Sequence, residues 1–161
     1  MTKGTSSSEP SLGGRPRELV DSTVFLLGYL GSVVKENACA EFERAGSNLY
    51  DHGILALLDE GASDTQAAIA DALEVDRGQL VGLLDALEAQ GLIERHRDPD
   101  DRRRHVVSLT AKGRRRLTKL RAVLREVEES VLAPLDADAR ATLRGLLLEV
   151  ASQKDRAVGR V

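Results

Sequence analysis

The sequence predicts a mostly helical protein with one small β-hairpin, and three observations lead to this fold class. Apolar residues make up 42% of the 161-residue chain and are mostly Leu, Ala and Val, a composition that favours helices over sheets. They recur at helical spacing over most of the chain, and two short strand-like segments stand near residues 92–97 and 103–109. At this length we expect one compact domain, or a small domain with an arm.

The N-terminal part is expected to be an arm followed by a long helix. Residues 1–16 are rich in Ser, Gly and Pro and are predicted to be disordered. A helix is predicted for residues 17–44, ending at Ala45-Gly46, because apolar positions recur there at helical spacing. These positions are Val20, Leu27, Leu30 and Val34.

Three shorter helices are expected between residues 47 and 91, each opened by a side chain that can accept a hydrogen bond from a free helix N–H. The candidate caps are Ser47 or Asn48, Ser63 or Thr65, and Asp76. Gln79 follows Asp76 by three residues, which is the spacing of a capping box. Gly91 is placed to end the third of these helices.

A hairpin and two long helices complete the chain. Asp98-Pro99 starts the turn of the hairpin, and His105, Val107 and Leu109 share one face of its second strand. Thr110 is placed to cap the next helix, and Asp136 or Asp138 the last one, with Pro134 between them. The first of these two helices has a coiled-coil-like seam of Leu117, Leu120, Leu124, Val127 and Val131.

This order of elements predicts a winged helix-turn-helix lobe, in which two short helices and an amphipathic third precede the hairpin. The long terminal helices leave apolar stripes uncovered, and a symmetric second copy is the simplest cover for them. We therefore expect a disordered arm (1–16), an N-terminal dimerisation helix (17–46), a winged helix-turn-helix lobe (47–113) and C-terminal dimerisation helices (114–161).

Positive charge is concentrated on the hairpin and on the start of the helix after it. Nine Lys or Arg and three Asp lie between Arg95 and Arg116, so this segment carries a formal charge of +6 in a chain of −3. The hairpin alone holds Arg95, Arg97, Arg102, Arg103 and Arg104. Such a concentration indicates an anionic partner at this place.

Other function classes find little support in the sequence. The four aromatic residues are too few for a base-stacking platform, and no apolar run approaches the ~20 residues of a membrane span. The N-terminus lacks the apolar segment of a secretory signal, and the single Cys39 cannot form an intrachain disulfide, so we expect a cytoplasmic protein. We see no nucleophile–base pair, phosphate loop or metal-ligand spacing, and expect no enzyme, no cofactor and no metal.

Residues 84–113 resemble the MarR family of bacterial transcription regulators. The matching elements are Leu87-Glu88 with Gly91-Leu92, the run Asp98-Pro99-Asp100-Asp101-Arg102-Arg103, and Leu109-Thr110 with Gly113. Helix order and lengths extend the resemblance to roughly residues 17–155. It implies a triangular homodimer joined by its terminal helices and bound to pseudo-palindromic double-stranded DNA. It also implies release of DNA by a small phenolic or anionic lipophilic effector.

The helix that starts at Arg77 is expected to enter the major groove of DNA. Arg77 is the best candidate reader because its guanidinium matches guanine O6 and N7. Gln79 either reads adenine or completes the capping box, and Thr65 and Gln66 open a helix whose N–H groups suit a phosphate, unless Thr65 is only a cap. Gly82 stands where the family often carries a polar or basic residue, which removes one expected contact.

The hairpin is expected to be the wing, which places arginine in the narrow minor groove of A·T-rich DNA. The resemblance assigns Arg103 to the wing tip and Asp101 to its orientation. Arg95 and Arg97, on the strand before, are counted with the wing, while Arg102 and Arg104 either reach phosphates or are solvated. Arg114, Arg115 and Arg116 are interpreted as a solvated face rather than a contact.

An effector pocket is expected near Phe25, Tyr29 and His52, although aromatic residues on such helices more often belong to the core. The resemblance places Val24 at the reactive cysteine of hydroperoxide-sensing members, so Cys39 is predicted to be a buried, inert thiol. His96 and His105 stand on the two strands and could lie close, but we expect a surface role rather than a metal site.

Two hypotheses from different classes follow. The first is a dimeric, DNA-binding transcriptional regulator. The alternative is a winged-helix module that binds protein without specific DNA binding. Two features favour it: the rest of the chain is acidic, and the expected recognition helix has few polar residues.

Overall fold

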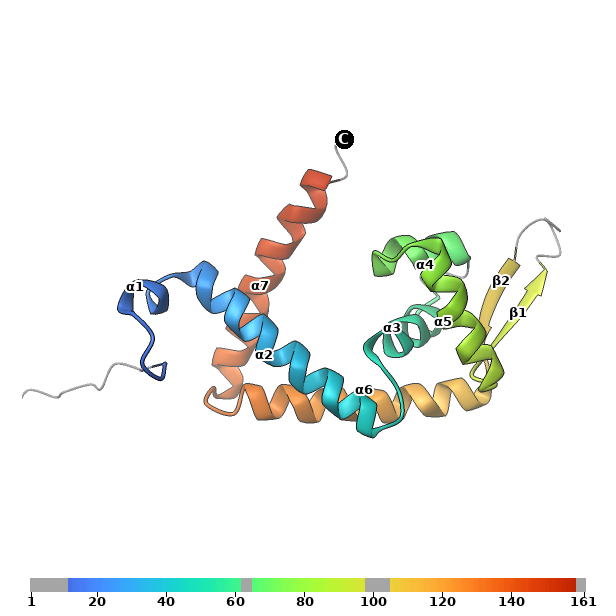
Figure 1. The fold of residues 1–161 in the computed structure, drawn as a ribbon, viewed down its shortest axis with the longest axis horizontal. Coiled ribbons are helices and arrows are strands. Elements are labelled where there is room, and N and C mark those ends of the chain that lie inside the picture. Colours follow the sequence, from blue (N-terminus) through green and yellow to red (C-terminus); the bar gives the residue numbers. More distant parts are fainter. Residues whose placement is uncertain (1–11, 62–64, 98–104, 159–161) are drawn as a thin grey trace, which may run out of the picture. The chain divides into compact units, whose positions relative to one another are not determined.

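The computed structural model describes residues 12–61, 65–97 and 105–158 (Figure 1). Helices make up most of this part, and a two-stranded antiparallel sheet completes it, so the predicted mostly α fold class is confirmed. The chain forms two compact units, residues 1–37 and residues 38–161, and each is described by itself.

The first unit holds α1 (Arg17–Val20) and α2 (Thr23–Arg44) as far as Asn37. The prediction of one continuous helix over residues 17–44 is wrong, because the chain turns at Asp21-Ser22. The Ser22 hydroxyl accepts a hydrogen bond from the Phe25 N–H at 3.3 Å, which starts a new helix in the way that serine favours.

Three helices of the second unit begin at predicted caps. They are α3 (Leu49–Asp59), α4 (Gln66–Leu73) and α5 (Arg77–Ala89). The caps are Asn48, Thr65 and Asp76, whose side-chain oxygens accept from the N–H groups of Asp51, Ala68 and Gln79 at 2.9, 3.3 and 2.9 Å. The turn from α4 to α5 contains Glu74 in the left-handed conformation, with φ of 52°.

The hairpin consists of β1 (Ile93–Arg97) and β2 (His105–Leu109), which pair with Ile93 opposite Leu109 and Arg97 opposite His105. The predicted strands are thus confirmed where they are described, while the predicted turn lies outside the described residues. Val107 and Leu109 are buried on one face, as predicted. An isolated bridge joins Thr65 to Val106, so the start of α4 lies beside β2.

The core of the second unit lies between the last turns of α2, the three short helices, the hairpin and α6 (Ala111–Val131). Its fully buried large side chains are Phe42, Ile54, Leu55, Ile69, Leu80, Leu84, Leu87, Ile93, Val107, Leu117 and Leu120. Thr110 caps α6, as predicted, because its hydroxyl accepts from the Gly113 N–H at 2.9 Å. The predicted seam of α6 is buried only in part, since Leu124 is exposed.

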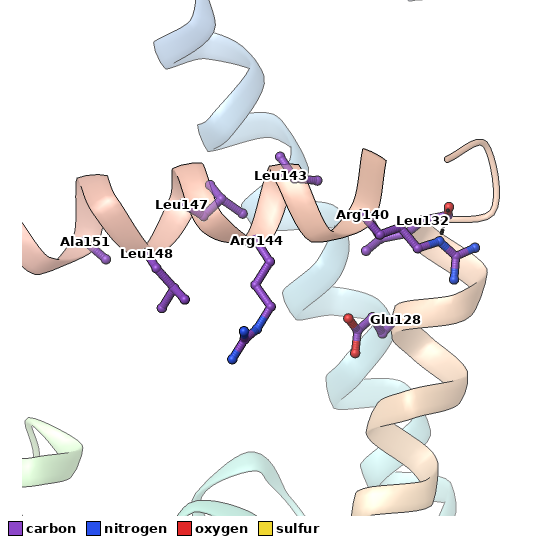
Figure 2. Close-up of a pocket in the computed structure, with 8 residues that line it drawn as sticks. All are labelled: Glu128, Leu132, Arg140, Leu143, Arg144, Leu147, Leu148 and Ala151. Carbon is purple, nitrogen blue, oxygen red and sulfur yellow. Dashed lines mark hydrogen bonds between the residues drawn. The ribbon is translucent and has the colours of Figure 1, made fainter. Parts of the chain in front are cut away.

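The last helix is α7 (Ala137–Val158), and Asp136 is the cap that opens it, accepting from the Ala139 N–H at 2.8 Å. Much of its apolar surface is exposed, including Leu146, Leu147, Leu148 and Val150. A groove of about 390 Å³ lies between α7 and the end of α6. Figure 2 shows its lining residues, with Arg144 extending from α7. Within the described ranges no helix is long and apolar enough to cross a membrane.

Candidate nucleic-acid interface

The first turn of α5 presents Arg77 and Gln79 to solvent, while Leu80 turns into the core. Asp76 makes its half of the predicted capping box, and the side chain of Gln79 is exposed. Val81 and Gly82 continue the exposed face, so a ligand on this side meets the N-terminal turn and then a small, partly apolar surface. A cap that fixes the first turn leaves the side chains of Arg77 and Gln79 available for contacts outside the helix.

Thr65 and Gln66 stand at the start of α4, where both are partly exposed. The Thr65 hydroxyl is engaged as the cap of the helix, which confirms the simpler of its two predicted roles. Because the Thr65 backbone also bridges to β2, this helix start is fixed relative to the hairpin.

Arg95 binds two carboxylates of α5 rather than extending into solvent. Its Nε donates to Glu88 at 2.8 Å, and a terminal nitrogen donates to Asp85 at 2.6 Å and also to Glu88. The backbone N–H of Arg95 donates to the same Glu88 side chain at 3.2 Å. These bonds tie β1 to α5, and they leave the Arg95 side chain only 23% exposed.

This tie also changes the ionisation of its members. The hydrogen bonds from Arg95 lower the pKa of Glu88, and the hydrogen bonds to Glu88 and then Asp85 raise the pKa of Arg95. Because the pKa of Glu88 is lowered in the folded state, its contribution to stability is present above its ordinary value and is lost as the pH falls through the folded value.

The wing itself is described only at its base. Arg97 is exposed at the end of β1. The predicted wing residues Asp101, Arg102, Arg103 and Arg104 lie outside the described residues.

The start of α6 contains two cations whose partners the sequence did not reveal. Lys112 Nζ donates to the Gln90 carbonyl at the end of α5, at 2.7 Å. Arg116 donates to the carbonyls of Ala45 and Gly46 at the end of α2. Arg114 and Arg115 are exposed, as expected of a solvated face, but that prediction is wrong for Arg116. The only available signal was general: basic side chains often bind the free carbonyls at helix ends.

The three residues proposed to line an effector pocket belong to two units. Phe25 and Tyr29 lie on α2 in the first unit, with parallel rings 6.3 Å apart, and the guanidinium of Arg15 lies 4.4 Å from the Tyr29 ring centre. His52 lies on α3 in the second unit, with its ring 5.5 Å from that of buried Phe42. Burial, and then the charge of Arg121, lower the pKa of His52.

One further expectation, on Cys39, needs correction. Cys39 is partly exposed rather than buried, because the buried face of α2 passes through its neighbours Ala38 and Phe42. His96 is exposed, as expected of a surface role; it pairs with Val106, and its Nε2 lies 3.2 Å from Ser108 Oγ. In the described part of the chain no group of three or more His, Cys, Asp or Glu could hold a metal ion.

An exposed first turn on α5, a hairpin tied to that helix and a second helix before it define a winged helix-turn-helix protein. The MarR family model matches residues 48–104, which hold α3, α4, α5 and the first strand of the hairpin. The repressor NicR of Pseudomonas putida KT2440 is 26% identical, and the alignment covers 98% of this chain and 99% of NicR. A protein described as a regulator of the hcr operon in Thauera aromatica is 33% identical, but the alignment covers only 60% of this chain and 58% of that protein.

Solved structures agree with this assignment. The repressor CouR bound to a 23-mer DNA duplex matches with a TM-score of 0.73 and 31% identity, covering 89% of this chain and 99% of that one. CouR from Rhodococcus jostii RHA1 bound to p-coumaroyl-CoA matches with a TM-score of 0.69 and 28% identity, covering 83% and 94%. The chain belongs to the MarR family of transcriptional regulators.

Proposed function

We propose that this protein is a transcriptional repressor that binds a pseudo-palindromic operator as a homodimer. The observation that carries the proposal is the exposed first turn of α5, capped by Asp76 and joined through Arg95 and Glu88 to the strand that leads into the arginine-rich segment. In the proposed complex α5 enters the major groove, and the arginine-rich segment enters the groove beside it. It acts in the cytoplasm, where the DNA lies, and it regulates rather than catalyses.

Each part of the interface has a role in the proposal. Arg77 and Gln79 read base edges, and the start of α4 at Thr65 and Gln66 faces a phosphate. In the wing Arg103 enters the minor groove, Asp101 orients it, and Arg97, Arg102 and Arg104 neutralise phosphates. Because its guanidinium is engaged by α5, Arg95 positions the wing instead of binding DNA.

Exposed apolar side chains support the homodimer. On α2 they include Val24, which is 81% exposed, with Leu27, Leu30 and Val34; on α7 they are Leu146, Leu147, Leu148 and Val150. A monomer rarely exposes two such sets, because apolar surface in water is unfavourable. A second copy of the chain covers them and brings a second α5 to the other half of the operator.

A small aromatic acid, or its coenzyme A thioester, is the effector class that we propose. CouR provides the support, since that relative binds p-coumaroyl-CoA. In this chain Phe25 and Tyr29 are the proposed effector contacts of the first unit, and His52 is a separate candidate in the second. A thermal-shift assay with p-coumaroyl-CoA, followed by a DNA-release assay, tests this part; stabilisation without any change in DNA affinity would count against an inducer.

Fluorescence anisotropy tests the main proposal. The wild-type protein is titrated with the DNA upstream of its own gene and with a scrambled duplex, at two salt concentrations. We expect tight, salt-dependent binding to the native duplex and much weaker binding to the scrambled one. Arg77→Ala should reduce this preference, whereas Arg125→Ala, which removes the same charge from an exposed place on α6, should not.

If both duplexes bind equally and weakly, selection from random DNA locates any other operator. Failure of that selection, together with capture of a protein partner that DNA does not displace, would refute the repressor and favour the protein-binding alternative.

A further inference from the structure

We propose that Arg116 is a positioning residue that fixes the direction in which α2 leaves the second unit, and thereby the half-site spacing that the dimer prefers. The inference rests on the proposed function. It concerns the connection between α2 and α3, residues 45–48, which we call the α2–α3 joint.

Arg116 reaches the α2–α3 joint from α6, seventy residues further along the chain. One terminal nitrogen donates to the Ala45 carbonyl at 2.7 Å and to the Gly46 carbonyl at 2.6 Å. Gly46 has a φ of 68°, so the helix ends there in the left-handed turn that glycine permits. A guanidinium at this place also opposes the partial negative charge at the end of α2.

Other polar groups of the joint bind the helices on either side of it. The N–H groups of Gly46 and Ser47 donate to the Glu43 and Phe42 carbonyls at 2.8 and 2.9 Å, which closes the helix end. Asn48 caps α3, and the Ser47 hydroxyl donates to Asp51 at 2.9 Å. Among the residues that the structure describes, Arg116 thus adds the hydrogen bonds that connect this joint to a distant element.

The start of α6, which carries Arg116, is anchored to the elements proposed to bind DNA. Lys112 binds the Gln90 carbonyl, and the Thr110 hydroxyl lies 2.8 Å from the Gly91 carbonyl and 3.1 Å from that of Leu92. The first two turns of α6 therefore connect the end of α5 with the end of α2. In the described part of the chain the bonds of Arg116 are the polar bonds between α6 and the joint, so a movement of α2 against this connection would break them.

This connection has a consequence for operator recognition. The exposed apolar face of α2 is part of the proposed dimer contact, so the direction of α2 sets how far apart the two α5 helices lie. Half-sites are separated by about 10–10.5 base pairs or a multiple of this, and a dimer held at one separation discriminates against a changed spacer. A dimer with a loose α2–α3 joint tolerates several spacers and binds each of them less tightly, because ordering the joint opposes binding.

Three variants test the inference on the tightest duplex that the wild-type protein selects from a random library, and on the same duplex with one or two base pairs added or removed. Arg116→Ala should lose about tenfold in affinity for the selected spacing and bind the altered spacings almost as well. Arg115→Ala, an equal charge change at the exposed neighbouring residue, should keep the wild-type spacing preference. Arg116→Lys should give an intermediate result, since an ammonium keeps the charge but lacks the planar fork.

Two readouts separate this inference from the proposed function. Hydrogen exchange of residues 45–48 should become faster in Arg116→Ala and remain unchanged in Arg115→Ala, while sedimentation should show dimers in both. A spacing preference and exchange rates in Arg116→Ala equal to those of Arg115→Ala would overturn the inference with the repressor intact. If the wild type selects no duplex, the proposed repressor function is overturned. Unchanged hydrogen exchange in Arg116→Ala would then also reject the positioning role of Arg116.

Discussion

The Cα of Gly113 lies against the backbone carbonyl of Leu92. A Cβ placed on Gly113 would come within 3.0 Å of the carbonyl carbon of Leu92 and closer still to its oxygen. This contact presses the first turn of α6 onto the residue before β1, which itself is buried. Glycine is required here for close packing and not for its backbone conformation, because Gly113 is helical and any residue can adopt that conformation.

Gly113→Ala should therefore destabilise the protein by about 3 kcal/mol, at the upper end of overpacking changes, because a backbone carbonyl cannot move aside as a flexible side chain can. Urea unfolding measures the change. Gly82→Ala is the matched control: it lies on an exposed helical surface with no neighbouring heavy atom within 4 Å, and it should gain about 0.5–1 kcal/mol from helix propensity. Equal stability of Gly113→Ala and the wild type would contradict the packing described.

Glu88→Gln should weaken specific DNA binding, even though a carboxylate removed near DNA would ordinarily strengthen it. The reason is that Glu88 holds both the guanidinium and the backbone N–H of Arg95, and so holds β1 on α5. Anisotropy on the selected duplex provides the measurement. Glu94→Gln, on the exposed side of the same strand, should bind as tightly as the wild type or slightly more so. The positioning role of Arg95 is rejected if the two variants behave alike.

The stability of the protein should decrease as the pH falls below the ordinary pKa of histidine, 6.5. Burial and the charge of Arg121 lower the pKa of His52, so the unfolded chain takes up a proton that the folded chain refuses. The loss begins near the ordinary value and levels off below the folded one. Urea midpoints at about pH 7.5 and about pH 5.5 measure it. His52→Gln should reduce the difference, and His96→Gln, on the exposed side of β1, should retain it.

Leu147→Glu should convert the proposed dimer into monomers, because a carboxylate cannot be buried in an apolar contact without a partner. Leu147 is 43% exposed and lines the groove between α6 and α7 (Figure 2). Sedimentation equilibrium measures the oligomeric state, and the DNA affinity should fall when the dimer is lost. Gln153→Glu adds the same charge to exposed surface of the same helix and should leave the dimer intact. A dimeric Leu147→Glu would place the interface elsewhere.

Local signals in the sequence predicted local structure well. The caps Asn48, Thr65, Asp76 and Thr110 were found because their chemistry involves neighbours within three residues. The break at Asp21-Ser22 was not predicted, because the apolar period continues past it and hides the capping tendency of a single serine.

The candidate site was predictable in its charge but not in its partners. The excess of arginine indicated an anionic ligand, yet the sequence could not show that Arg95 binds α5 or that Arg116 binds the end of α2. Those partners lie seven and some seventy residues away, and a count of charges contains no information on such pairings. The roles of Arg77 and of the wing remain predictions.

The left-handed Glu74 bears on how this turn can vary among related chains. A residue with a Cβ loses roughly 1–2 kcal/mol in that conformation, whereas glycine would lose about 0.5–1 kcal/mol through its greater backbone freedom in the unfolded chain. The two effects oppose each other in part, so Glu74→Gly should change the stability by only about 1 kcal/mol or less. Substitutions of residue 74 among related chains therefore say little about selection, even though this residue lies between α4 and α5, the two helices of the helix-turn-helix.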